Sequence, residues 1–213
     1  MGTYAWDPLN TKTASIALSN NDRTATALVA GTTQNTRSEW KKSSGKWYWE
    51  IRHDVGRGDY QTWGICRSDG STDYTINTRA GWNESWAMMY NGRAYHDGSY
   101  NSKTYSTSEE EILGFALDLD TGKLFCAIDN VWQSSANPVL GLNPQFSDST
   151  MTGYDISATY STRIESDAST TNFKSDELVY APPTGFAALD DISEEGFFMS
   201  NQKRIINHVN LRR

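Results

Sequence analysis

Cysteine, proline and histidine are scarce in this chain of 213 residues, which has two, five and three of them. The two cysteines, Cys66 and Cys126, form neither a metal-binding motif nor a disulfide framework. Both stand in apolar contexts, "WGICR" and "LFCAI", that are typical of buried strands. The sequence therefore predicts reduced thiols in a core.

Positive charge is also in short supply. Lysine and arginine total 19 against 26 acidic residues, which gives a net charge of −7 and a pI near 4.9. No cluster of basic residues is dense enough to follow a phosphate backbone, so nucleic-acid binding is excluded as a function class. The acidic balance also disfavours adhesion to anionic glycans, although not to neutral sugars.

Long hydrophobic runs are missing as well. No stretch approaches the roughly 18 consecutive apolar residues that a membrane-spanning helix needs. The first ten residues, "MGTYAWDPLN", lack the charged and apolar regions of a secretory signal. We expect a protein that is made in a cytoplasm, stays soluble and does not insert into a membrane.

Aromatic residues, in contrast, make up 12% of the chain and include eight tryptophans. That supply of large apolar surface is enough for a core and argues against global disorder. In "GKWYWEI", side chains alternate between the two faces of a strand. The pattern predicts Trp47, Trp49 and Ile51 in the core, with Glu50 on the other face and Tyr48 either exposed or packed under a covering segment.

Turn signals divide the chain into short strands and predict an antiparallel sandwich or barrel. Asn91-Gly92 marks one hairpin, and "ILGFALDLDTGKLFCAIDN" reads as two strands joined by a tight turn. The same "DLDTG" has a superficial likeness to a calcium loop, but a hairpin turn is favoured. The alternation places further core residues at Ile65, Phe115, Leu117 and Ile128.

Four segments in this order resemble the SPRY domain, the core of B30.2 modules. They are "SGKWYWEI", "YQTWGICR", "EEEILGFALDLDTGKLFCAIDN" and "NFKSDELVYAPPTGFAAL". The likeness covers roughly residues 3–189; Lys174 and Val131 stand where the family usually has glycine. With "AWDPLN" near the start and "PPTGFAAL" at the close, the chain looks most similar to small SPRY proteins of tailed bacteriophages.

The resemblance implies a bent, concanavalin-like β-sandwich over residues 1–189 and a C-terminal extension over residues 190–213. It also implies a protein that binds other proteins or peptides through loops at one rim and is not an enzyme. The residues agree, because His53, His96 and His208 lie in separate regions, and a solvated loop position is the favoured interpretation of His96. No cofactor and no metal are expected.

The predicted binding residues fall in two sets. The first is aromatic and polar, and we expect alternate members to lie in the core; it comprises Trp82, Trp86, Tyr90, Arg93, Tyr95, His96 and Tyr100. Tyr95 and Tyr100 flank the Asp97-Gly98 turn and are the better surface candidates. The second set belongs to the extension, as a docking segment: Phe197, Phe198, Lys203, Arg204, Ile205, Arg212 and Arg213.

Three functions remain open. The first is a structural component of a phage virion, in the head or tail, that docks on another virion protein, with several copies in the assembly. The second is a lectin-like module that adsorbs to a host surface protein or glycan. The third is an adaptor that binds a short peptide. The first is preferred, because the other two do not need the extension of residues 190–213.

Overall fold

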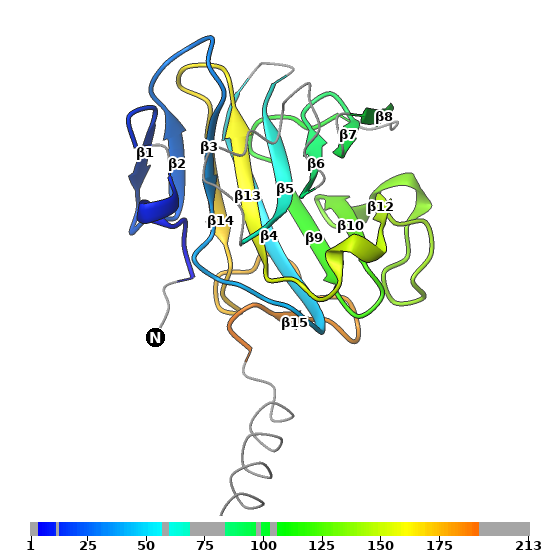
Figure 1. Cartoon of the computed structure of the whole chain (residues 1–213). Coiled ribbons are helices and arrows are strands. Elements are labelled where there is room, and N and C mark those ends of the chain that lie inside the picture. The colour runs from blue at the N-terminus through cyan, green and yellow to red at the C-terminus, as the bar shows by residue number, and fades with distance from the viewer. Residues whose placement is uncertain are drawn as a thin grey trace, which may run out of the picture.

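The computed structural model describes residues 4–11, 13–56, 60–68, 84–96, 99–102 and 106–191, with the side chains of residues 101 and 102 left aside. These residues form two mainly antiparallel sheets, which Figure 1 shows packed against each other. The only helices among them are the short 3₁₀ turns η1 (Pro8–Asn10), η2 (Gln133–Ser135) and η3 (Ser149–Met151). None of them is long enough to cross a bilayer. The predicted all-β sandwich is confirmed.

The larger sheet has nine strands in the described part of the chain. Its order is β1 (Ile16–Ser19), β2 (Thr24–Ala27), β14 (Ala168–Asn172), β4 (Lys46–Val55), β9 (Ile112–Asp118), β10 (Lys123–Ile128) and β11 (Val131–Trp132). In addition, β12 (Phe146–Ser147) pairs with β10, and β15 (Ala187–Ala188) runs parallel to the start of β4. Strand β14, which comes late in the chain, therefore separates β2 from β4.

The smaller sheet has six strands among the described residues. Its order is β3 (Gln34–Arg37), β13 (Ile156–Thr162), β5 (Thr62–Arg67), β6 (Ser85–Met89), β7 (Arg93–His96) and β8 (Ser99–Ser102). The predicted hairpin at Asn91-Gly92 is confirmed, because it joins β6 to β7. Strand β13 lies between β3 and β5, so a late strand completes this sheet too.

The main core lies between the sheets, and strand alternation builds it as expected. Trp49, Phe115 and Ile65 are fully buried there, and the rings of Trp49 and Phe115 stack with centroids 5.4 Å apart. Trp47 points to the same side but is only half-buried, because it lies at the beginning of β4. There Lys42 Nζ lies 3.6 Å from the centroid of the indole ring of Trp47, which corrects the expectation of a fully buried residue.

A second, smaller core covers the outer face of the larger sheet. Tyr48, Ala116 and Phe125 point away from the main core, and Phe186 of the chain's closing segment packs on them. Of the two positions left open for Tyr48, packing under a covering segment is the one observed. Gly114 leaves room for it, since a Cβ at this position would lie 2.8 Å from the Tyr48 hydroxyl oxygen.

Glu50 is buried on this outer face, which sequence alternation had assigned to polar, surface-facing residues. Its carboxylate accepts hydrogen bonds from the backbone N–H groups of Val179 and Tyr180, at 2.7 and 2.8 Å, and from the Tyr48 hydroxyl at 3.0 Å. Burial and the adjacent carboxylate raise the pKa of Tyr48 well above its usual range. The phenol therefore stays protonated and donates a hydrogen bond to Glu50. The buried charge thereby holds the closing segment on the sheet.

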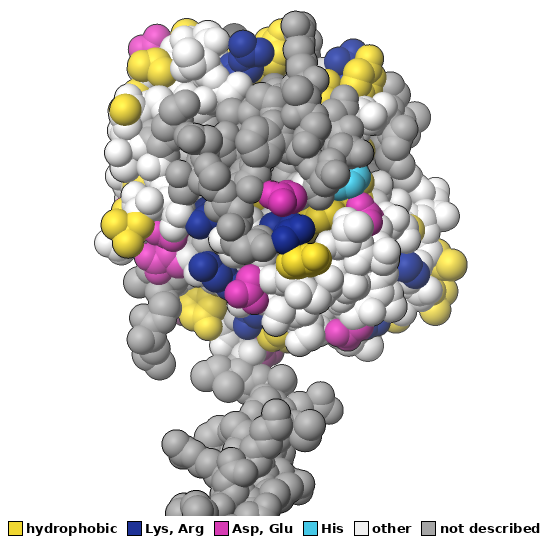
Figure 2. Space-filling view, in the orientation of Figure 1, with side chains coloured by type: hydrophobic (Ala, Val, Ile, Leu, Met, Phe, Trp, Pro, Cys, Tyr) yellow, Lys and Arg dark blue, Asp and Glu magenta, His cyan; other side chains and the backbone are white. Residues whose placement is uncertain are grey.

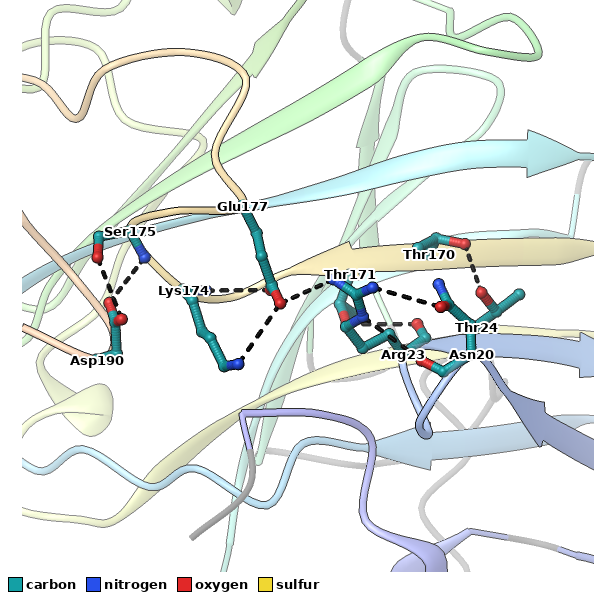
Figure 3. Close-up of polar contacts among 9 residues, drawn as sticks. All are labelled: Asn20, Arg23, Thr24, Thr170, Thr171, Lys174, Ser175, Glu177 and Asp190. Carbon is teal, nitrogen blue, oxygen red and sulfur yellow. Dashed lines mark hydrogen bonds and ion pairs between the residues drawn. The ribbon is translucent and has the colours of Figure 1, made fainter. Parts of the chain in front are cut away.

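Figure 3 shows how the closing segment is also tied to the β1–β2 hairpin. Arg23 Nη1 lies 2.7 Å from Glu177 Oε1, and Lys174 Nζ lies 3.7 Å from the same oxygen. Further along, the backbone N–H of Ser175 donates to Asp190 at 2.8 Å. These contacts of the closing segment thus reach Asp190, one residue past the fully buried Leu189, and the boundary predicted at residue 189 stays a prediction.

Replacing Phe115 with alanine should lower the free energy of unfolding by about 3–5 kcal/mol, because it empties a fully buried position against Trp49. Urea denaturation of the purified protein measures the change. A loss close to zero would contradict the strand register described here.

Replacing Glu50 with glutamine should destabilise the protein by about 1–3 kcal/mol, because the amide group cannot accept all three hydrogen bonds. Hydrogen exchange at the amides of Val179 and Tyr180 should accelerate. Glu177→Gln is the matched control: its ion pair with Arg23 is partly exposed and should contribute less than about 1 kcal/mol. Unchanged protection at both amides in Glu50→Gln would show that Glu50 does not hold the segment.

Candidate functional site

Strands β7 and β8 divide the predicted binding residues between two faces. Side chains alternate along β7, so Ala94 and His96 point toward the core while Arg93 and Tyr95 point away from it. Tyr100 on β8 lies directly opposite Tyr95 in the antiparallel register. Three of the predicted residues therefore meet on the outer face of the smaller sheet.

Tyr95, Tyr100 and Arg93 make up what we call the tyrosine platform. The two phenol rings stack with centroids 5.3 Å apart and an interplanar angle of 28°. The guanidinium carbon of Arg93 lies 4.6 Å from the centroid of the Tyr100 ring. Tyr100 is 50% exposed although it is aromatic, whereas Arg93 and Tyr95 are half-buried. The result is an ordered surface with apolar rings, hydroxyl groups and one positive charge.

The platform stands at the end of its sheet. Strand β8 is the last in the strand order of the described residues, next to β7 alone. The Asp97-Gly98 turn that joins the two strands lies outside the described residues. Tyrosine and arginine in such a position are the residue types that dominate the binding energy of protein interfaces.

His96 is not the solvated loop residue that the sequence suggested. Its ring stacks on Trp86 with centroids 4.8 Å apart, and its Nδ1 lies 2.9 Å from the backbone oxygen of Ser85. Its Nε2 lies 2.9 Å from Asp148 Oδ2. Both ring nitrogens thus lie within hydrogen-bond distance of acceptors of the protein.

Asp148 is the partner that sequence reasoning missed. The indole N–H of Trp86 donates to its carboxylate at 3.0 Å, and Thr150 donates through its backbone N–H and hydroxyl. Although burial opposes ionisation, these hydrogen bonds and His96 hold the pKa of Asp148 below its usual value. The cluster thus ties β6 and β7 to the turn η3. The "DST" sequence, typical of a residue that caps a turn, was the available signal.

The remaining predicted residues do not join the platform. Trp86 is fully buried in the core, and Tyr90 is half-buried, with its ring centroid 5.5 Å from that of His53. Trp82 lies outside the described residues. So do all seven predicted residues of the extension, and their docking role stays a prediction: Phe197, Phe198, Lys203, Arg204, Ile205, Arg212 and Arg213.

The "DLDTG" segment forms the hairpin turn that the sequence favoured. Asp118 Oδ1 accepts hydrogen bonds from the backbone N–H groups of Asp120 and Thr121, both at 3.1 Å, and Asp118 Oδ2 lies 3.1 Å from Lys46 Nζ. The Asp118 carboxylate therefore stabilises the turn. Among the residues with described positions, no group of three or more His, Cys, Asp or Glu side chains is arranged to hold a metal ion.

Cys126 is buried, as predicted, and burial raises the pKa of its thiol to about 12. Cys66 is buried as well.

In Figure 2, the basic side chains drawn in dark blue are spread among acidic and uncharged ones on this face instead of forming one patch.

Solved structures of known proteins share this fold. The SPRY domain of human HERC1 superposes with a TM-score of 0.63 at 13% identity, over 78% of this chain and 96% of that one. The TRIM65 PSpry domain gives 0.59 at 17% identity, over 80% and 90% of the two chains. Stonustoxin gives 0.57 at 18% identity, over 79% of this chain and 27% of that one. No family model and no curated protein matches the sequence. The chain is thus a β-sandwich with the SPRY fold.

Replacing Asp148 with asparagine should destabilise the protein at neutral pH, because the hydrogen bonds and His96 favour the ionised carboxylate. A depressed pKa gives stability above the ordinary pKa of aspartate that is lost as the pH falls through the native value. The difference between wild type and variant should therefore shrink as the pH falls from neutrality to below the ordinary pKa of aspartate, about 3.9. Chemical denaturation at several pH values measures it, and a difference independent of pH would contradict this interpretation.

Proposed function

We propose that this chain is a non-enzymatic binding module that contacts another protein through the tyrosine platform. One observation carries the proposal: Tyr100 stays half exposed while Tyr95 and Arg93 hold its ring in place. Ordering the side chains before binding lowers the entropy that association costs. A partner therefore meets a rigid surface instead of three mobile side chains.

The chemistry of the platform favours a protein partner over a sugar. A sugar stacks on an open aromatic face, but the Tyr100 ring is already in contact with Tyr95 and Arg93. What remains are ring edges, hydroxyl groups and the guanidinium. The hydroxyl groups and the guanidinium can donate hydrogen bonds to backbone carbonyls and carboxylates. Strand β8 adds a backbone edge, a feature that extended peptides use in other proteins.

We further propose that the module is a structural component of a tailed-phage virion, made in the host cytoplasm and docked on another virion protein. The support comes from the sequence, in the resemblance of "AWDPLN" and "PPTGFAAL" to small phage SPRY proteins. The protein should then copurify with intact particles through a density gradient, as detected by mass spectrometry. Its presence in the infected-cell lysate but not in purified particles would exclude this role.

The binding proposal is tested by capture of virion proteins on the immobilised chain. Tyr100→Ala should weaken the captured complex roughly tenfold or more, a loss typical of a residue that dominates an interface. Tyr60→Ala is the matched control, because Tyr60 is a tyrosine of similar exposure, 45%, whose ring centroid lies 5.2 Å from the guanidinium carbon of Arg163 instead of Arg93. Equal losses in the two variants would contradict the proposal. Binding of the wild type to neutral sugars on a glycan array, abolished by Tyr100→Ala, would favour the lectin-like function instead.

A further inference from the structure

Two uncharged stretches cover the outer face of the larger sheet. Residues 131–147 and residues 178–189 contain no Asp, Glu, Lys, Arg or His, in a chain that is 21% charged. They meet over the smaller core, where Ala136 and Phe186 belong to one cluster with Trp132 and Leu178 packed against it. We call this surface the uncharged cover.

The cover exposes an unusual number of large apolar side chains. It contributes five of the twelve exposed large hydrophobic residues described: Val131, Val139, Leu140, Leu142 and Val179. Single exposed apolar residues are common on soluble proteins, but a group within one uncharged region marks an interaction surface. Figure 2 shows apolar side chains at the right edge, where the loop after β11 lies in Figure 1.

Part of the cover is a rigid projection, the apolar turn of residues 137–142. Asn137 and Leu142 exchange two backbone hydrogen bonds, at 2.9 and 3.0 Å, and the Asn137 side chain accepts from the backbone N–H of Leu140 at 3.0 Å. Gly141 has a φ of +67°, which suits glycine, and its carbonyl accepts from Lys123 Nζ at 3.0 Å. The turn therefore presents Leu140, 67% exposed, from a fixed backbone.

Another part of the cover is a concavity of about 290 Å³ in the closing segment. Leu178, Val179, Pro182 and Phe186 provide much of its wall, and Asp191 stands beside them. The cover thus has an apolar projection with a lysine at its base. It also has a concavity of apolar and polar residues, which Ser175 and Asp191 border from outside the cover. Both parts carry apolar side chains, and the lysine and the carboxylate are opposite in charge.

We propose that the uncharged cover is a self-association surface, on which the apolar turn of one copy enters the concavity of a second copy. A two-fold pair uses the same surface on both partners, so one cover supplies both halves of each contact. Copies with a charge of −7 repel each other, and an uncharged region is where that repulsion is smallest. Lys123 of one copy approaches Asp191 of the other. This surface lies on the other sheet from the tyrosine platform, and it goes beyond the proposed partner binding.

Sedimentation velocity over a concentration series, up to on the order of 100 µM, tests the proposal. The wild type should dimerise, and Leu140→Asp should raise the dissociation constant at least tenfold because it places a charge in the apolar contact. Val179→Asp should do the same from the side of the concavity. Leu9→Asp is the control, because Leu9 is 92% exposed and lies on η1, outside the cover. This substitution should leave dimerisation unchanged.

A mixture separates this geometry from a general loss of solubility. Leu140→Asp keeps an intact concavity and Val179→Asp keeps an intact apolar turn, so the mixed pair retains one of two contacts. It should associate more tightly than either variant alone. A wild type that remains monomeric, or a Leu140→Asp variant that dimerises as the wild type does, overturns the proposal. Thermal unfolding of each variant checks that the sandwich is intact. If a monomeric variant still captures virion proteins, the tyrosine platform is unaffected by the substitution.

Discussion

The outer half of the molecule depends on the hydrogen bonds that the carboxylate of Glu50 accepts from the closing segment and from Tyr48. The carboxylate brings a negative charge into the interior, and two backbone amides and the Tyr48 phenol compensate for the lost hydration. Because both amides belong to the closing segment, that segment is fixed over β4 at one point of its path. The smaller core forms beneath it, and strand β4 is thereby buried on both faces for much of its length.

This double burial decides where surfaces for partners are left. The space between the sheets is filled by tryptophans and phenylalanines, and the outer face of the larger sheet is closed by the cover. The tyrosine platform therefore stands at the far end of the smaller sheet, on β7 and β8. The apolar turn projects beyond the edge formed by β10, β11 and β12. Two surfaces of different chemistry thus occur on different sheets, so the two proposed contacts do not compete for one face.

Strand alternation explains how much of this the sequence revealed. Two-residue periodicity placed Trp49 and Phe115 in the core and located the hairpins at Asn91-Gly92 and after Asp118, because these depend on neighbours along the chain. Periodicity could not predict contacts between segments that are far apart in the sequence. Nothing near Glu50 in the sequence indicates that residues 179 and 180 will donate to it.

The same limit applies to the candidate site. Of the set around β6 to β8, Tyr95 and Tyr100 lie on the face away from the core, as expected, and their binding role stays a prediction. His96 was misplaced because Asp148, 52 positions further on, holds it at the sandwich end. Trp47 was placed on the correct face, but its burial depends on where the sheet ends, which periodicity does not show.

The strand order has a consequence for synthesis of the chain. In the larger sheet β14 separates β2 from β4, and in the smaller sheet β13 separates β3 from β5. A nascent chain that has emerged only as far as residue 150 lacks the strand that joins the early part of each sheet to its neighbour. Strands β4 and β5 then each lack a partner strand that lies 89 to 122 positions further along the chain. Such non-local pairing belongs to the slow end of folding rates, and open edges invite pairing with other chains. Both sheets can therefore be completed only after β13 and β14 have been synthesised.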